Sequence, residues 1–142
     1  MKIAFFFFVC LSLTASHAQA QKSVARSTTA VSVVAVKAPG QAIYEQYCLA
    51  CHQANGSGVP NLNPPLRGTD WVVGDKTRLV NVLLKGLQGL EIDGEFYDNA
   101  MPAHAFLDDA KIADVLTYIR SNFGNKADAV TADEVKAVRA VK

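Results

Sequence analysis

Cysteine, methionine and histidine are scarce in this chain, and their positions limit the chemistry that it can perform. The 142 residues include three cysteines, two methionines and three histidines. Cys10 and Met1 fall within the first 20 residues, so Cys48 and Cys51 are the only thiols downstream. We therefore expect no structural disulfide. The chain also lacks the second pair of Cys or His ligands that a structural zinc site needs.

A long apolar run is missing as well. The apolar stretch from Ile3 to Leu11 is shorter than the roughly 20 residues of a membrane-spanning helix. It follows Lys2 and precedes small residues that end in Ala18-Gln19-Ala20, an order typical of a secretory signal peptide. We predict that residues 1–20 are a signal peptide cleaved after Ala20. The protein is then exported, to the periplasm in a bacterium, and meets a membrane only through a partner.

Neither sign of charge dominates the sequence. Lys and Arg total 14 and Asp and Glu total 13, for a net charge of +1, which argues against a nucleic-acid partner. The charges are unevenly placed, because residues 40–125 hold six basic and ten acidic side chains, a net charge of −4. We expect this region to be attracted to a basic docking face, with an association rate that falls as salt rises.

What the sequence does contain is the pattern C-x-x-C-H, in Cys48-Leu49-Ala50-Cys51-His52. This pattern is the attachment motif of a c-type haem. Two thiols one helical turn apart can add to the two vinyl groups at one edge of the porphyrin, and the following His lies under the iron as an axial ligand. A thioredoxin-like redox pair would lie near a βαβ pattern, which is missing here. We predict one haem c, with its iron, attached covalently through Cys48 and Cys51.

Met101 and His104 are the two candidates for the second axial ligand of the iron. Met101 lies 49 residues beyond His52 and precedes Pro102, which stiffens the backbone around it. A lone Met more often fills a gap in a core, but a haem iron here needs a sixth ligand. We favour Met101 as that ligand. His104 is the alternative, or else a surface group near the haem edge that titrates near neutral pH.

A proline-rich loop follows the attachment motif. Residues 55–66 are rich in Asn, Gly and Pro and end in Asn63-Pro64-Pro65-Leu66, which predicts irregular structure. The ring nitrogen of His52 that faces away from the iron needs an acceptor that fixes the orientation of the ring. The Pro64 carbonyl is our candidate. The alternative is that the two prolines only stiffen the chain around the haem edge.

Apolar periodicity predicts an all-α fold, with three main helices and a short C-terminal helix around the haem. The first helix runs from Gly40 into the motif, and the second spans about residues 77–85. The third begins at Asp108 and is closed by Gly124. A capping-box sequence at residues 131–134 predicts the short C-terminal helix.

Composition divides the chain behind the signal peptide into three regions. Residues 21–39 are rich in Ser, Thr, Ala and Val and show no helical period. We expect them to form a flexible arm, or to pack on a partner subunit through the valines of residues 31–36. Residues 40–125 form the haem domain, and residues 126–142 are a C-terminal extension.

Taken together, these features resemble a class I c-type cytochrome. The resemblance covers about residues 40–125 and rests on the Gly-x-x-x-Tyr helix before C-x-x-C-H, the Pro-Pro-Leu loop, the Met-Pro segment and the Leu-Thr-Tyr-Ile-Arg sequence. The chain is similar to bacterial monohaem cytochromes that are partners or electron-accepting subunits of exported dehydrogenases. The resemblance implies thioether attachment at Cys48 and Cys51, axial ligation by His52 and Met101, and a bond from His52 to Pro64.

Two functions follow from the two coordination states of the iron. With both axial positions held by protein, the chain is an electron carrier and not an enzyme, passing single electrons from a donor dehydrogenase to an acceptor such as a terminal oxidase or another cytochrome. With Met101 off the iron, a five-coordinate haem beside His104 suits a haem enzyme or a gas sensor. A free carrier is expected to be a monomer that docks on redox partner proteins through small, transient interfaces.

Overall fold

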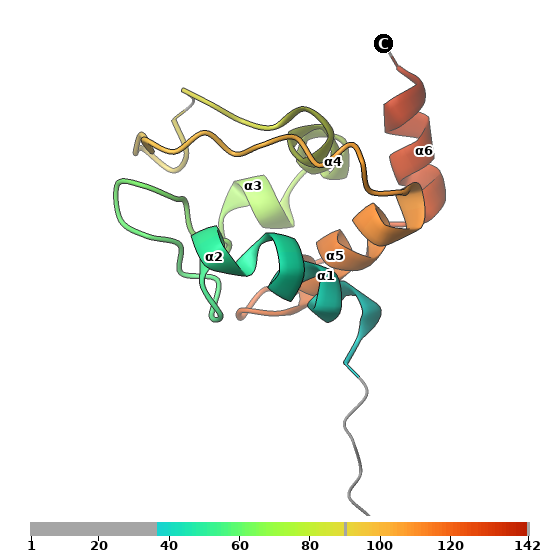
Figure 1. The fold of residues 1–142 in the computed structure, drawn as a ribbon, viewed down its shortest axis with the longest axis horizontal. Helices are drawn as coiled ribbons and strands as arrows, with labels where there is room; N and C mark the ends of the chain where they lie inside the picture. The colour runs from blue at the N-terminus through green and yellow to red at the C-terminus, as the bar shows by residue number, and fades with distance from the viewer. Residues whose placement is uncertain (1–36, 90, 142) are drawn as a thin grey trace, which may run out of the picture. The chain divides into compact units, whose positions relative to one another are not determined.

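The structure is a computed structural model in which residues 37–89 and 91–141 are described. The predicted signal peptide, its cleavage site and nearly all of the predicted arm therefore lie outside the described residues. The described residues form an all-α fold, in which short β-bridges join loops and no strand occurs. The helices are α1 (Pro39–Tyr47), α2 (Leu49–His52), α3 (Asp70–Val73), α4 (Lys76–Lys85), α5 (Asp109–Ser121) and α6 (Ala132–Ala140) (Figure 1).

Helices α1 and α5 cross at very close range because Gly40 has no side chain. A Cβ atom on Gly40 would lie 2.1 Å from the carbonyl oxygen of Asp114 and 2.7 Å from the Cβ of Tyr118. Next to this crossing, the rings of Tyr44 and Tyr118 lie 5.6 Å apart, and the Tyr44 and Phe123 rings lie 5.1 Å apart. The crossing fixes α1, and with it the attachment motif, against the longest helix.

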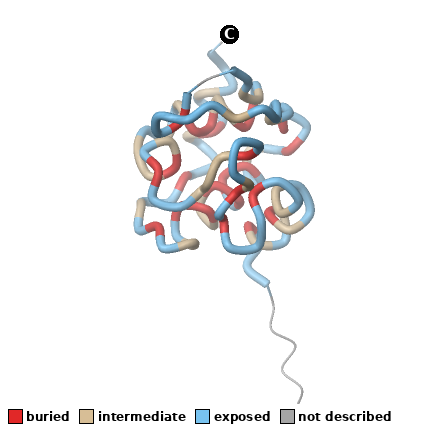
Figure 2. Tube along the Cα trace, turned by 90° about the vertical axis from the view of Figure 1, so that its left-hand side faces the viewer, coloured by how far each residue is buried: buried red, intermediate tan, exposed pale blue. Residues whose placement is uncertain are grey.

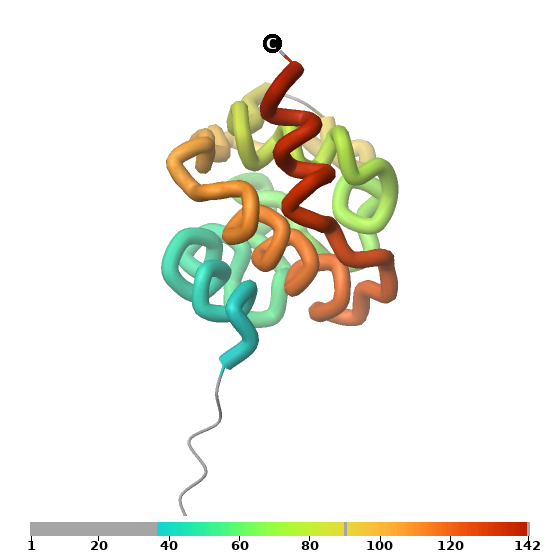
Figure 3. Tube along the Cα trace, turned by 90° about the vertical axis from the view of Figure 1, so that its right-hand side faces the viewer, coloured from blue at the N-terminus to red at the C-terminus, as the bar shows by residue number. Residues whose placement is uncertain are grey.

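Side chains placed just before each helix explain where α4, α5 and α6 begin. Asp75 accepts from the backbone N–H of Arg78, and Asp108 accepts from that of Lys111. Thr131 and Glu134 form the predicted capping box at α6. These three helices match the predicted ones, and α6 lies across α5 and α4 (Figure 3).

Two local features differ from the prediction. Helix α3 is an additional turn, capped by Thr69, and its four residues are too few to show a helical period. Helix α5 ends at Ser121, before Gly124, so the predicted glycine cap is wrong. The reason lies in the buried amide of Asn125, which donates to the carbonyls of Ile119 and Leu66 at 2.8 Å and draws the chain into a turn.

The core lies between the helices, where the buried residues are concentrated (Figure 2). Its centre is apolar, with fully buried side chains from α1, α3, α4, α5 and α6: Tyr44, Val72, Val80, Ile112, Val115, Leu116 and Val135. Among the described residues, no helix is both long enough and apolar enough to cross a membrane.

Candidate functional site

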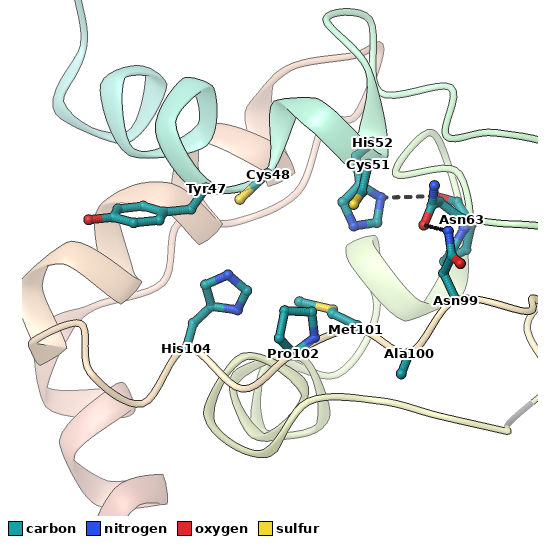
Figure 4. Close-up of a pocket in the computed structure, with 11 residues that line it drawn as sticks. Tyr47, Cys48, Cys51, His52, Asn63, Asn99, Ala100, Met101, Pro102 and His104 are labelled. Carbon is teal, nitrogen blue, oxygen red and sulfur yellow. Dashed lines mark hydrogen bonds between the residues drawn. The ribbon is translucent and has the colours of Figure 1, made fainter.

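The attachment motif occupies one turn at the junction of α1 and α2. Cys48 lies between α1 and α2, and its carbonyl accepts from the backbone N–H groups of Cys51 (3.2 Å) and His52 (2.9 Å). This turn places all three side chains along one side of the same cavity (Figure 4). Both thiols are free, and Cys51 is exposed. Burial raises the pKa of the Cys48 thiol to about 11, with a smaller contribution from the nearby Cys51.

His52 is held by the backbone of the proline-rich loop. Its side chain is buried, and its Nδ1 lies 3.0 Å from the carbonyl oxygen of Pro64. A donor at Nδ1 leaves Nε2 as the nitrogen with a free lone pair. Desolvation by burial lowers the pKa of His52, and the nearby His104 lowers it further, while the bond to Pro64 opposes both effects. The lowered pKa favours the neutral ring, the form that binds a metal.

Met101 lies on the opposite wall of the cavity, in the segment that follows α4. Its backbone N–H donates to the Leu87 carbonyl at 2.8 Å, and the Leu87 N–H donates back at 3.0 Å. Gly86 permits this close approach, because a Cβ there would lie 2.5 Å from the Met101 carbonyl oxygen. The Met101 side chain lines the same cavity as Cys48, Cys51 and His52 (Figure 4).

The space beyond His52 and Met101 has apolar walls. Two neighbouring cavities are lined by both residues and by apolar side chains of α3, α4 and α5, among them Val72, Leu79 and Leu116. Trp71 lines one of them. Water is therefore poorly accommodated between His52 and Met101.

His104 is buried, so the prediction that it lies at the surface is wrong. Its exposed fraction is 8%. Its backbone N–H donates to the Leu83 carbonyl of α4 at 2.7 Å, and its ring packs beside the rings of Tyr47 and Phe106, which also contact each other. Among the described residues, Nδ1 of His104 has no hydrogen-bond partner. Figure 4 shows the His104 ring on the side of Cys48 and Tyr47, away from Asn63 and Asn99.

A pair of hydrogen-bonded amide side chains, Asn63 and Asn99, lines the other side of the cavity and was not predicted (Figure 4). The Asn99 amide donates to Asn63 Oδ1 at 3.1 Å, and the backbone N–H of Asn99 donates to the Leu62 carbonyl. These bonds join the proline-rich loop to the Met101 segment. No periodicity or motif links two asparagines that are 36 positions apart, so only the folded chain reveals the pair.

The residues around the cavity fit a covalently attached haem. Two thiols, a buried imidazole with a free Nε2 and a thioether share one cavity, and its neighbours are lined by apolar side chains. The unpartnered Nδ1 of His104 is a further buried polar atom of a residue that lines the cavity. Soft sulfur and imidazole nitrogen are the donor atoms that haem iron takes from proteins.

The chain is similar in sequence to known proteins. Residues 37–123 match the family model described as Cytochrome c. The chain is 40% identical over 116 residues to cytochrome c-552 of Thermus thermophilus, covering 75% of this chain and 88% of the relative. It is 39% identical over 106 residues to the cytochrome c subunit of the alcohol dehydrogenase (quinone) of Gluconacetobacter polyoxogenes, covering 71% of this chain and 22% of that subunit. It is 36% identical over 107 residues to the gluconate 2-dehydrogenase cytochrome c subunit of Pantoea cypripedii, covering 70% of this chain and 24% of that subunit.

Proposed function

The chain belongs to the cytochrome c family and carries single electrons on a haem c attached through Cys48 and Cys51, and we propose that His52 and Met101 are its axial ligands. The observation that supports this ligand pair most directly is the cavity that His52 and Met101 line from opposite elements. His52 comes from α2, and Met101 comes from the segment after α4. A second cavity, lined by the same two residues and α3–α5, extends the space between them.

Each ligand residue is positioned by hydrogen bonds to backbone groups. The Pro64 carbonyl holds Nδ1 of His52 and so keeps the ring in one orientation. The paired bonds with Leu87 hold the backbone of Met101. When bound, the haem iron supplies the one-electron ferric–ferrous couple. A thioether ligand and apolar walls both favour the ferrous form and so raise the reduction potential.

This arrangement supports a carrier over a haem enzyme or a gas sensor. With both axial positions taken by side chains, no coordination position is left for a substrate or a gas. The family match and the relatives that are named as cytochromes point the same way. We therefore infer that electrons enter and leave through the edge of the site, at the mouth of the cavity.

We further propose that an exported dehydrogenase is the electron donor. Two relatives are cytochrome c subunits of dehydrogenases, although the similarity spans less than a quarter of each subunit. The mouth of the cavity suits transient docking. In the described part of the chain the cavity is lined by no Asp, Glu, Lys or Arg, and Tyr47 in its lining and the neighbouring Phe106 are 39% and 67% exposed.

The location and the division of the chain are part of the same proposal. We propose that residues 1–20 direct the chain out of the cytoplasm, as the order of charged, apolar and small residues supports. Residues 21–39 are then a linking arm, residues 40–125 the haem domain and residues 126–142 an extension of it.

Absorption spectra of the purified, exported protein test the proposed ligand pair. Spectra are recorded in both oxidation states, with and without carbon monoxide. We expect a low-spin haem, a red band in the ferric state that is diagnostic of thioether ligation, and no shift with carbon monoxide. A high-spin spectrum that shifts with carbon monoxide would overturn the ligand pair. It would favour the alternative function, a haem enzyme or gas sensor with an open coordination position.

A further inference from the structure

The segment that carries Met101 is held at its start by the region around the end of α4. We call residues 101–109 the ligand segment. Met101 exchanges two backbone bonds with Leu87, and the His104 N–H donates to the Leu83 carbonyl. Beyond His104 the segment leaves α4, and Ala105 and Phe106 are exposed. Leu107 is buried in the core, but the carbonyls of Ala105 and Leu107 are bound from a different element.

In that second half, the carbonyls of Ala105 and Leu107 are bound by one side chain of α6. Arg139 donates from Nη1 to the Ala105 carbonyl at 3.0 Å and from Nη2 to the Leu107 carbonyl at 2.8 Å. Its Nε donates to the Asp109 carboxylate at 2.7 Å. Among the described residues, no other side chain donates to these two carbonyls. The rigid fork of a guanidinium can serve three such acceptors at once, which an ammonium group cannot do in the same geometry.

Helix α6 is firmly docked and so provides a fixed support for Arg139. Val135 is fully buried in the core, and the capping box holds the start of the helix. Lys76 of α4 forms an ion pair with Glu134 at 2.9 Å. Figure 3 shows α6 lying across α5 and α4. All of α6 lies beyond residues 37–123, the part that matches the cytochrome c family model, so this support is additional to the matched region.

We propose that Arg139 is a positioning residue that keeps the ligand segment closed and so keeps the Met101 sulfur in place as the axial ligand. This inference rests on the proposed role of Met101. To withdraw its sulfur, the segment must move away from the cavity, and the movement breaks the bonds from Arg139 to Ala105 and Leu107. Hydrogen bonds from a charged donor are stronger than neutral ones, so they shift the equilibrium toward the closed segment.

Imidazole binding to the ferric holoprotein measures this equilibrium, because an added imidazole can bind only when the Met101 sulfur is off the iron. Loss of the red thioether band reports binding. For Arg139→Ala we expect an imidazole affinity about tenfold higher than that of the wild type, the size expected for loss of partly exposed charged hydrogen bonds. The reduction potential is expected to shift in the same variant, since the ligand is less firmly held.

Lys76→Ala is the matched control. It removes the ion pair between α4 and α6 and leaves all three acceptors of Arg139 intact. We expect its imidazole affinity to equal that of the wild type, even if denaturant unfolds it earlier. An equal increase in affinity for both variants would show general loosening of α6 and overturn the proposal, as would wild-type affinity in Arg139→Ala.

The wild-type spectrum separates this inference from the ligand assignment itself. If the wild type lacks the red band, the assignment of Met101 fails before any variant is made. If the band is present, only the role of Arg139 is in question. Should Arg139→Ala yield no holoprotein, Arg139→Lys is measured in its place, because it keeps the charge facing Asp109 and loses the fork. Wild-type imidazole affinity in Arg139→Lys then overturns the proposal.

Discussion

At the scale of single residues, function was predictable where chemistry itself fixes the spacing. Two thiols and an imidazole must fall within one turn to hold a haem, so Cys48, Cys51 and His52 could be recognised without any knowledge of the fold. His104 could not be placed in this way. Its burial depends on one backbone bond to Leu83, 21 positions earlier, and no local pattern encodes that bond.

Replacement of Met101 tests the second ligand. In Met101→Ala we expect the haem to remain attached, because the thioether links are untouched, while the ferrous protein now binds carbon monoxide and the ferric protein loses its red band. Absorption spectroscopy measures both effects. His104→Ala is the control and should keep the red band. The reverse pattern, with the band kept in Met101→Ala and altered ligation in His104→Ala, would make His104 the ligand.

At the scale of helices, starts were easier to predict than ends. Asp75, Asp108 and Thr131 cap helices that begin one residue later, so each signal lies next to the feature that it controls. The end of α5 is set by Asn125, whose amide bonds reach Leu66 across 59 positions. Such a distant partner leaves no trace in local periodicity.

The crossing of α1 and α5 predicts a large effect at Gly40. A side chain at this position must push against the backbone of Asp114, which cannot move without shifting α5. We expect Gly40→Val to lower the free energy of unfolding by about 1–3 kcal/mol, as overpacking does. Denaturant unfolding of the holoprotein measures the change. Gln46→Ala, at an exposed position of the same helix, should have little effect; equal stabilities for the two variants would contradict the close crossing.

The start of α6 predicts a dependence of stability on pH. Bonds from Thr131 and then from Lys76 lower the pKa of Glu134 below its ordinary value of 4.5. A lowered pKa in the folded state means stability that is present above pH 4.5 and is lost as the pH falls through the lower, folded value. We expect Glu134→Gln to lose less stability than the wild type between pH 5 and pH 3. Parallel unfolding midpoints for both proteins across that range would refute this role.

At the scale of the whole molecule, the all-α class and the central place of the haem were predictable, while the arrangement of α6 was not. The motif and the apolar stripes each follow from neighbouring residues. By contrast, α6 is placed by contacts with α4 and α5. These include the ion pair between Lys76 and Glu134, which lie 58 positions apart in the sequence. Arg120 likewise joins distant segments, through bonds to the carbonyls of Val72, Gly74 and Asp128.

The position of the haem site within the core predicts that the apoprotein is largely unfolded. The cavities between His52, Met101 and the apolar walls lie where a chain of this size has little other core to supply stability. We expect far-UV circular dichroism of protein made without haem attachment to show low helix content and no cooperative melt. The holoprotein, measured alongside, should melt cooperatively. A cooperative melt of the apoprotein would show that the helices suffice alone.

The net charge of −4 over residues 40–125 predicts a salt effect on electron transfer. We expect the rate of reaction with a basic protein partner to fall as ionic strength rises, because screening weakens long-range attraction. Stopped-flow kinetics measure the rate, and an uncharged small-molecule reductant should react at a rate that salt leaves unchanged. A rate with the basic partner that is independent of salt would contradict charge steering. Docking would then depend on the uncharged surface around the cavity.

The hydrogen bonds from α6 to the ligand segment can form only late in the synthesis of the chain. Synthesis proceeds from the N-terminus, and Arg139 lies 88 positions after Cys51. A chain cut short before α6 still contains the attachment motif, α1 to α5 and Met101, yet the carbonyls of Ala105 and Leu107 have lost their donor. Such a chain therefore holds every residue of the attachment motif, whereas the hydrogen bonds from Arg139 to the segment that carries Met101 form only once the last helix has been made.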